Sequence, residues 1–253
     1  MSVRVRRRSK PSLLVRLRIF WVFIAVALAA AAYAGYVLAT WPGFNATSVV
    51  VDGNKHVSSD EILARAAIPR DRNIWLVDKR GAERRVEALP WIESARIHRS
   101  LPAAVTLVVA ERVPAACALA GSARYLVDRE AHVLATDCNW PAQLLDVRWP
   151  PLAQAQRPGA VLDAPRLERL LRDDAVLRAQ HLDPATAGLD RFDGLEVTLR
   201  GGPLVRFGDD ADLSEKAKLV EPILRTYAAE AKGVAVVDVR SPAAPVVEER
   251  KRP

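Results

Sequence analysis

Several residue types and motifs that enzymes commonly use are scarce or missing in this chain. It has only two cysteines and four histidines among 253 residues. The sequence contains no G-x-S-x-G elbow, no phosphate-binding Walker loop, no H-E-x-x-H helix and no C-x-x-C pair. The histidines are scattered, and no two of them have the spacing of metal ligands. We therefore expect no catalytic residues, no cofactor and no metal site, which argues against an enzyme.

Charged residues are missing from one long stretch near the amino terminus. None occurs between Arg18 and Asp52, and the apolar part of this stretch runs from Ile19 to Thr40. A hydrocarbon layer of roughly 30 Å requires about 20 apolar residues in a helix. Trp21 and Trp41 lie near the two ends, where aromatic rings suit the headgroup layer. The sequence therefore predicts a transmembrane helix over residues 19–40.

Two alternatives to a membrane anchor stay open. The stretch resembles a cleaved signal peptide, with Ala32-Tyr33-Ala34 as a passable cleavage site. However, the apolar run continues beyond the roughly 7–15 residues of a signal peptide. A buried helix of a soluble protein would seldom lack charge on every face. The length of the run therefore favours an uncleaved anchor.

The net charge of +7 is concentrated before the apolar run. No acidic residue occurs in residues 1–18, and the cations there account for the whole net charge: Arg4, Arg6, Arg7, Arg8, Lys10, Arg16 and Arg18. By the positive-inside rule this basic tail is cytoplasmic and the rest of the chain is exported. Because the remainder is neutral, we expect attraction to anionic lipid and exclude nucleic acid as a partner.

Apolar periodicity after the anchor predicts a β-α-α-β-β order over about seventy residues. The first predicted helix begins with a capping box at Ser58 and Glu61. We expect Ile74, Trp75 and Leu76 of the following connector to pack against that helix. The predicted strands occupy residues 47–52, 94–98 and 103–112, and the predicted helices begin at Ser58 and Asp78 and are ended by Pro69 and Pro90.

The second half of the chain alternates helix and strand signals. Asp163 is expected to cap one helix, and Asp212 to open a longer one. A hairpin is predicted across Gly201-Gly202, and a last strand over residues 234–240. Prolines at positions 242 and 245 weaken any strand signal beyond that point.

Five motifs in register carry a resemblance to a known family. They are Val51-Asp52-Gly53-Asn54, Val57-Ser58 with Glu61-Ile62, Leu89-Pro90-Trp91-Ile92, Ala95-Arg96-Ile97 with Arg99-Ser100-Leu101-Pro102, and Ala110-Glu111-Arg112-Val113-Pro114-Ala115. This set resembles the FtsQ-type POTRA domain of the bacterial FtsQ/DivIB division proteins. The later segments Tyr125-Leu126-Val127-Asp128 and Val237-Asp238-Val239-Arg240 resemble motifs of the β-domain in that family.

The resemblance implies an α+β fold behind a single N-terminal transmembrane helix. It implies a β-α-α-β-β POTRA domain over residues 44–113 and a mixed, mostly antiparallel β-domain with packed helices over residues 114–241. Residues 242–253 would form a tail. The implied function is a non-enzymatic scaffold of the divisome in the inner membrane at the septum, with an extracytoplasmic β-domain that binds FtsB-like and FtsL-like bitopic proteins.

The resemblance also implies where such partners bind. An exposed final strand can accept an incoming strand by β-augmentation. The candidate residues are Val237, Val239, Arg240 and Ser241, the last standing where the family often has an aromatic residue. Arg240 is expected to bind a partner carboxylate, although the two valines would also fit a core.

One structural alternative and two functional alternatives remain for the exported part. An oxidising compartment permits a disulfide between Cys117 and Cys138, but two separately buried thiols fit the sequence as well. A POTRA-bearing chaperone or secretion component is a second functional class, although the sequence has one POTRA copy and no barrel-length set of strands. A secreted protein with a cleaved signal is the third alternative.

Overall fold

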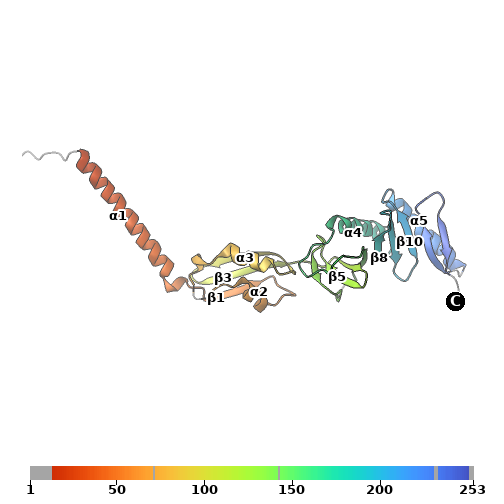
Figure 1. Cartoon of the computed structure of the whole chain (residues 1–253), viewed down its shortest axis with the longest axis horizontal. Coiled ribbons are helices and arrows are strands. Elements are labelled where there is room, and N and C mark those ends of the chain that lie inside the picture. The colour runs from red at the N-terminus through yellow and green to blue at the C-terminus, as the bar shows by residue number, and fades with distance from the viewer. Residues whose placement is uncertain (1–12, 71, 142, 231–232, 251–253) are drawn as a thin grey trace, which may run out of the picture. The chain divides into compact units, whose positions relative to one another are not determined.

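The computed structural model describes residues 13–70, 72–141, 143–230 and 233–250 (Figure 1). Most of the predicted basic tail therefore lies outside the described residues. The chain divides into two compact units. The first comprises residues 1–86 and 95–109, and the second comprises residues 87–94 and 110–253. Both helices and sheets are present, so the predicted α+β class is confirmed.

Helix α1 (Leu13–Thr40) contains the predicted membrane span. Its segment Leu17–Thr40 has a mean hydropathy of 2.2 and is long and apolar enough to cross a membrane. The large apolar side chains of this segment are exposed, as expected for a helix that contacts lipid.

The predicted β-α-α-β-β arrangement follows α1 and lies mainly in the first unit, with the three strands in the order β1-β3-β2. Ser58 caps α2 by accepting a hydrogen bond from the Glu61 backbone N–H at 3.2 Å. Strand β1 pairs with β3 in parallel, with Val50 opposite Thr106. The elements are β1 (Ser48–Asp52), α2 (Ser59–Ala66), α3 (Lys79–Glu87), β2 (Ile92–Ser100) and β3 (Ala104–Glu111).

The connector between α2 and α3 differs from the expectation. Its short 3-10 turn, Ile74–Leu76, follows Asn73, whose side chain accepts a hydrogen bond from the Trp75 backbone N–H. This tight turn sends successive side chains in different directions. Only Ile74 is buried, whereas Trp75 and Leu76 are 55% and 56% exposed. The prediction that all three pack against the first helix is therefore wrong for Trp75 and Leu76.

The second unit is built on a nine-stranded sheet in its described residues, in the order β12-β11-β10-β9-β8-β7-β4-β5-β6. Five of its strand pairs are antiparallel and three are parallel. Its strands are β4 (Ala116–Ala120), β5 (Ala123–Val127), β6 (Val133–Ala135), β7 (Leu145–Trp149), β8 (Pro184–Leu189), β9 (Leu195–Leu199), β10 (Leu204–Gly208), β11 (Val234–Asp238) and β12 (Val246–Glu249).

Two helices, α4 (Ala164–Ala179) and α5 (Leu213–Ala229), share a core with this sheet. The core contains Leu167 and Leu170 of α4, Val220 of α5 and alternate strand residues such as Val197 and Phe207. The period of two in a strand leaves the other sheet face polar. The predicted cap at Asp163 is confirmed by a hydrogen bond from the Arg166 backbone N–H. Helix α5 begins directly after Asp212, as predicted, although the Asp212 side chain makes no hydrogen bond to the first turn.

Candidate partner-binding edge

The four candidate residues lie at one end of the nine-stranded sheet, on β11 and directly after it. Val237 and Val239 are fully buried and belong to the core. Arg240 and Ser241 are exposed and lie in the loop between β11 and β12. The structure thus separates the candidates into two core residues and two surface residues. Their part in partner binding stays a prediction.

The guanidinium of Arg240 is already engaged within the chain. Its Nε lies 3.0 Å from Oδ1 of Asp238, and its terminal nitrogen lies 2.6 Å from Oδ2. These hydrogen bonds hold the pKa of the Asp238 carboxyl below its usual value. The side-chain stem of Arg240 crosses Gly208, where a Cβ would lie 2.9 Å from Cγ of Arg240. A partner carboxylate would therefore have to compete with Asp238 for the guanidinium of Arg240.

Strand β11 is not the final strand of the sheet. It pairs with β10 in parallel on one side and with β12 antiparallel on the other. The predicted tail over residues 242–253 therefore contains a strand, and the backbone of β11 offers no open edge. The correction has a physical reason: Pro242 and Pro245 lie in the connecting loop, so neither interrupts the ladder of β12.

The two ends of the sheet differ in how their outer edges are covered. At the β6 end, the Val133 backbone N–H donates to Ala160 O, and the Gly159 N–H donates to Val133 O, both at 2.8 Å. The segment around Ala160 thus covers that edge. At the other end, no strand of the described chain pairs with the outer side of β12. Strand β12 is therefore the edge at which another chain could add a strand.

The polar face of the sheet carries a row of charges that leads toward this edge. Arg148 on β7 reaches Glu196 on β9, with 3.2 Å between its terminal nitrogen and Oε2. Glu196 Oε1 also lies 3.2 Å from Nε of Arg206 on β10. Gly188 on the intervening strand makes the first contact possible, because a Cβ there would lie 2.8 Å from Nε of Arg148. These ion pairs link β7, β9 and β10 across the polar face.

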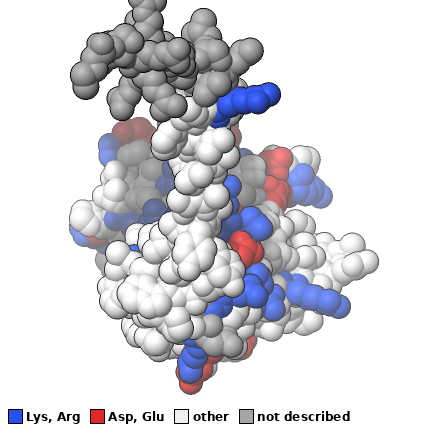
Figure 2. Space-filling model, turned by 90° about the vertical axis from the view of Figure 1, so that its left-hand side faces the viewer, with Lys and Arg blue, Asp and Glu red and all other residues white. Residues whose placement is uncertain are grey.

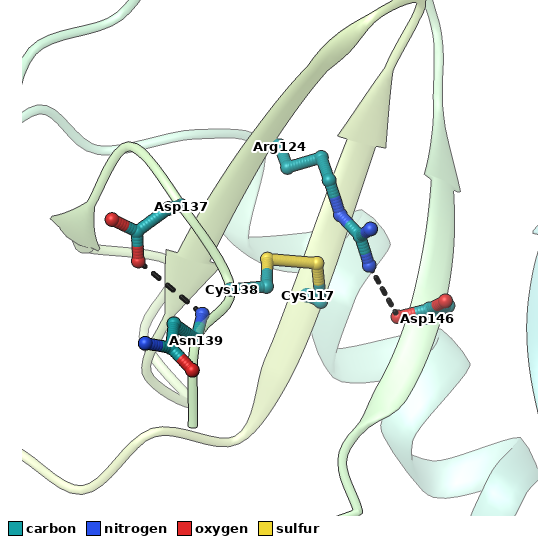
Figure 3. The surroundings of a disulfide bond; sticks show 6 residues. All are labelled: Cys117, Arg124, Asp137, Cys138, Asn139 and Asp146. Atoms are coloured by element: carbon teal, nitrogen blue, oxygen red, sulfur yellow. Dashed lines mark hydrogen bonds and ion pairs between the residues drawn. A yellow bond between two sulfur atoms is a disulfide. The ribbon is translucent and has the colours of Figure 1, made fainter. Parts of the chain in front are cut away.

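A disulfide joins Cys117 on β4 to Cys138, which follows β6 (Figure 3). The two Cα atoms are 5.8 Å apart. Cys117 lies opposite Asp146 in the register of β4 and β7, so the bond lies on the polar face of the sheet. Arg124 and Asp146 form an ion pair of 3.8 Å beside it. The disulfide therefore holds the loop after β6 against the sheet.

One group of side chains has the donor set of a metal site. Ligand atoms of Asp128, Glu130 and His132 lie within 4.8 Å of one another. However, the guanidinium of Arg112 lies 2.8 Å from Oδ2 of Asp128 and 3.1 Å from Nδ1 of His132. This cation already neutralises the buried carboxylate, so a second cation would be repelled. The cluster is better explained as a buried ion pair that links two of the family-like motifs.

Sequence reasoning missed two features of this region. The signal for β12 was the short run Val246-Val247-Glu248-Glu249, which begins with two β-branched residues. The pairing of Arg112 with Asp128 had no sequence signal, because contacts between distant residues follow from the tertiary fold.

Comparisons with known proteins agree with the fold. A family model described as POTRA domain, FtsQ-type, matches residues 44–112. A protein of Chloroflexus aurantiacus named Cell division protein FtsQ is 31% identical over 188 residues, which are 72% of this chain and 66% of that protein. A protein of the same name from Syntrophotalea carbinolica is 28% identical over 225 residues, which are 79% of this chain and 72% of that protein.

Together with helix α1, these matches define a division protein of the membrane-anchored kind that carries an FtsQ-type POTRA domain. The chain belongs to the FtsQ family of cell division proteins. The aligned segments span 66% and 72% of the two relatives' own lengths.

Proposed function

We propose that this protein is a non-enzymatic, single-pass scaffold of the bacterial division machinery. In this proposal, β12 captures the exported segment of an FtsB-like or FtsL-like bitopic protein by strand addition. The observation that carries the proposal is the position of β12 at the uncovered end of the nine-stranded sheet. The ladder of an incoming strand would supply affinity, and alternate side chains would select the partner.

The orientation of the β12 backbone follows from one hydrogen bond. The Arg250 N–H donates to the Gly233 carbonyl at 2.7 Å, so it points toward β11. Backbone groups alternate in direction along an antiparallel strand. The N–H of Val247, three residues earlier, is therefore directed away from β11 and toward an incoming strand. Val246 is 59% exposed, and Arg240 and Ser241 in the preceding loop are candidates for additional side-chain contacts.

A proline at position 247 tests strand addition directly. Val247→Pro removes the outward N–H and leaves the ladder to β11 in place, because prolines are tolerated on edge strands with the N–H side facing solvent. We expect capture of the FtsB-like and FtsL-like segments to be lost. The matched control, Val246→Ser, removes an exposed apolar side chain but keeps the backbone edge, and it should retain most of the capture. Pull-down with the full chain in detergent measures both.

The fold must be monitored in the same samples. Protease resistance and circular dichroism of Val247→Pro should match those of the unsubstituted chain. Undiminished capture by a folded Val247→Pro chain would remove β12 from the proposal. If Val246→Ser alone abolished capture, side-chain contacts and not the backbone ladder would have to carry the binding.

We further infer that α1 is an uncleaved anchor with a cytoplasmic amino terminus and exported domains. The support is the cluster of cations in residues 1–18, which carries the whole net charge of +7. A reporter enzyme that is active only outside the cytoplasm should be active when fused after residue 253. Recovery of a membrane-free chain shortened near Ala34 would instead indicate a cleaved signal peptide.

A further inference from the structure

The last turn of α1 is held to the connector between α2 and α3. The side-chain amide of Asn73 donates to the carbonyl oxygens of Leu38 and Ala39 at 2.8 and 3.1 Å. Asn73 is buried, and its side-chain oxygen accepts the Trp75 N–H. The last carbonyls of a helix lack partners within the helix, and leaving them unpaired near hydrocarbon is costly. Asn73 therefore fixes the connector at the level where α1 ends.

An apolar groove lies at this junction. It has a volume of about 390 Å³. Its walls come from the end of α1 and from the β-α-α-β-β fold after it, which we call the POTRA unit. Leu38 and Ala39 of α1 line it, together with Phe44, Trp75, Leu76 and Leu101 from the residues that follow the helix. The last three are 55%, 56% and 66% exposed, so water would contact them in a soluble protein. Three large apolar side chains exposed at one place indicate a surface that is covered when the protein is in its own environment.

The length of α1 places this groove at the membrane surface. The apolar segment Leu17–Thr40 has 24 residues and is about 36 Å long. The hydrocarbon layer is roughly 30 Å thick, so the last turn of the helix reaches the headgroup layer. Trp41 follows directly and is exposed, as interfacial aromatic residues commonly are. The groove is therefore continuous with the surface through which α1 contacts lipid.

The charges beside the groove fit phospholipid headgroups. The guanidinium of Arg99 lies over the Trp75 ring, 5.9 Å from its centroid. Arg70 and Arg72, which are exposed, precede Asn73 closely in the connector. The helix that descends from the grey residues in Figure 2 presents an uncharged surface below its upper end. Aromatic rings with adjacent cations are typical of protein surfaces in the interfacial layer of a membrane.

We propose that Trp75, Leu76 and Leu101 insert into the bilayer leaflet at which α1 ends, with phospholipid chains occupying the groove. The POTRA unit is then held against the membrane by this second contact in addition to the helix. The inference goes beyond the scaffold function and does not depend on capture at β12, since lipid contact requires no partner protein.

Site-specific photocrosslinking tests the proposal in the full chain. A photoactivatable phenylalanine analogue replaces Leu76 in one sample and Val108 in the other, and the protein is reconstituted into vesicles of phosphatidylethanolamine and phosphatidylglycerol. Val108 is the control because it is an exposed apolar residue that does not line the groove. It lies in the second half of β3, whereas Leu101, which lines the groove, precedes the start of that strand. Mass spectrometry should find several-fold more lipid adducts at position 76 than at position 108.

A second variant separates insertion from chance proximity. Leu101→Glu places a charge in the groove and should lower the lipid adducts at position 76 several-fold, while the adducts at position 108 stay unchanged. Equal lipid labelling at positions 76 and 108 would overturn the proposal. Protein adducts in place of lipid adducts at position 76 would also overturn it, because they would make another protein segment the occupant.

Discussion

Asp173 on α4 shows how a single buried carboxyl can influence stability. Its Oδ2 lies 3.9 Å from Nε of Arg169, and this oxygen has no hydrogen-bond partner within the described structure. Asp210 shares the same guanidinium, with 3.7 Å between its Oδ2 and Nε of Arg169. Burial is the largest influence and raises the pKa of Asp173 above its usual value of 3.8.

This shift has a defined effect on the pH dependence of stability. The folded state holds the Asp173 proton more tightly than the unfolded state, so stability falls as the pH rises from about 3.8 through the raised folded-state pKa. Asp173→Asn removes this loss. We expect the variant to be more stable than the unsubstituted chain at neutral pH, with the difference shrinking toward acid pH.

Denaturant unfolding of both chains between acid and neutral pH measures that difference. A difference independent of pH would contradict the assignment, because a neutral amide and an ionising carboxyl must diverge as the carboxyl loses its proton. Other groups with shifted pKa values, such as Asp238, titrate equally in both chains and cancel from the comparison.

The elements differ in how well the sequence predicted them. Helix α1 was predictable from its lack of charge and helix α2 from its capping box, because both are local signals. The exposure of Trp75 and the strand β12 were not, because both depend on which surface a neighbouring element covers. The hydrogen bonds between Arg240 and Asp238 were also not predictable, although the two residues are close in sequence. The partner that a side chain bonds depends on the fold around it.

The disulfide holds the loop after β6 in place and joins cysteines that are 21 residues apart in the sequence. Closing a loop of this size lowers the entropy of the unfolded chain and stabilises the folded state by about 3 kcal/mol. Cys117→Ala with Cys138→Ala should therefore lower the free energy of unfolding by about 3 kcal/mol. Alanine is preferred over serine because Cys117 is buried and a hydroxyl there would lack a partner.

Chemical unfolding of the full chain in detergent micelles checks this prediction. The reduced, unsubstituted chain is the matched control, and it should unfold at nearly the same denaturant concentration as the double variant. Equal stability of the oxidised chain and the double variant would show that the bond adds nothing to the fold of this unit.

The whole molecule combines a membrane helix, a POTRA domain that follows it and a sheet whose terminal strand β12 has no neighbouring strand on its outer side within the described residues. Each part supplies a different physical function. In our proposals the apolar helix fixes the chain in the bilayer, and the edge strand β12 of the second unit receives a strand of another chain. The proposed groove contact would set the height of the POTRA unit above the lipid.

Complementation in the host is the sharpest test of strand addition at β12. Cells depleted of this protein are supplied with the unsubstituted chain, Val246→Ser or Val247→Pro at equal levels and are observed by microscopy. We expect septa with the first two chains and filaments without septa with Val247→Pro. Normal septation with a folded Val247→Pro chain at the same level would contradict strand addition at β12 as the basis of function.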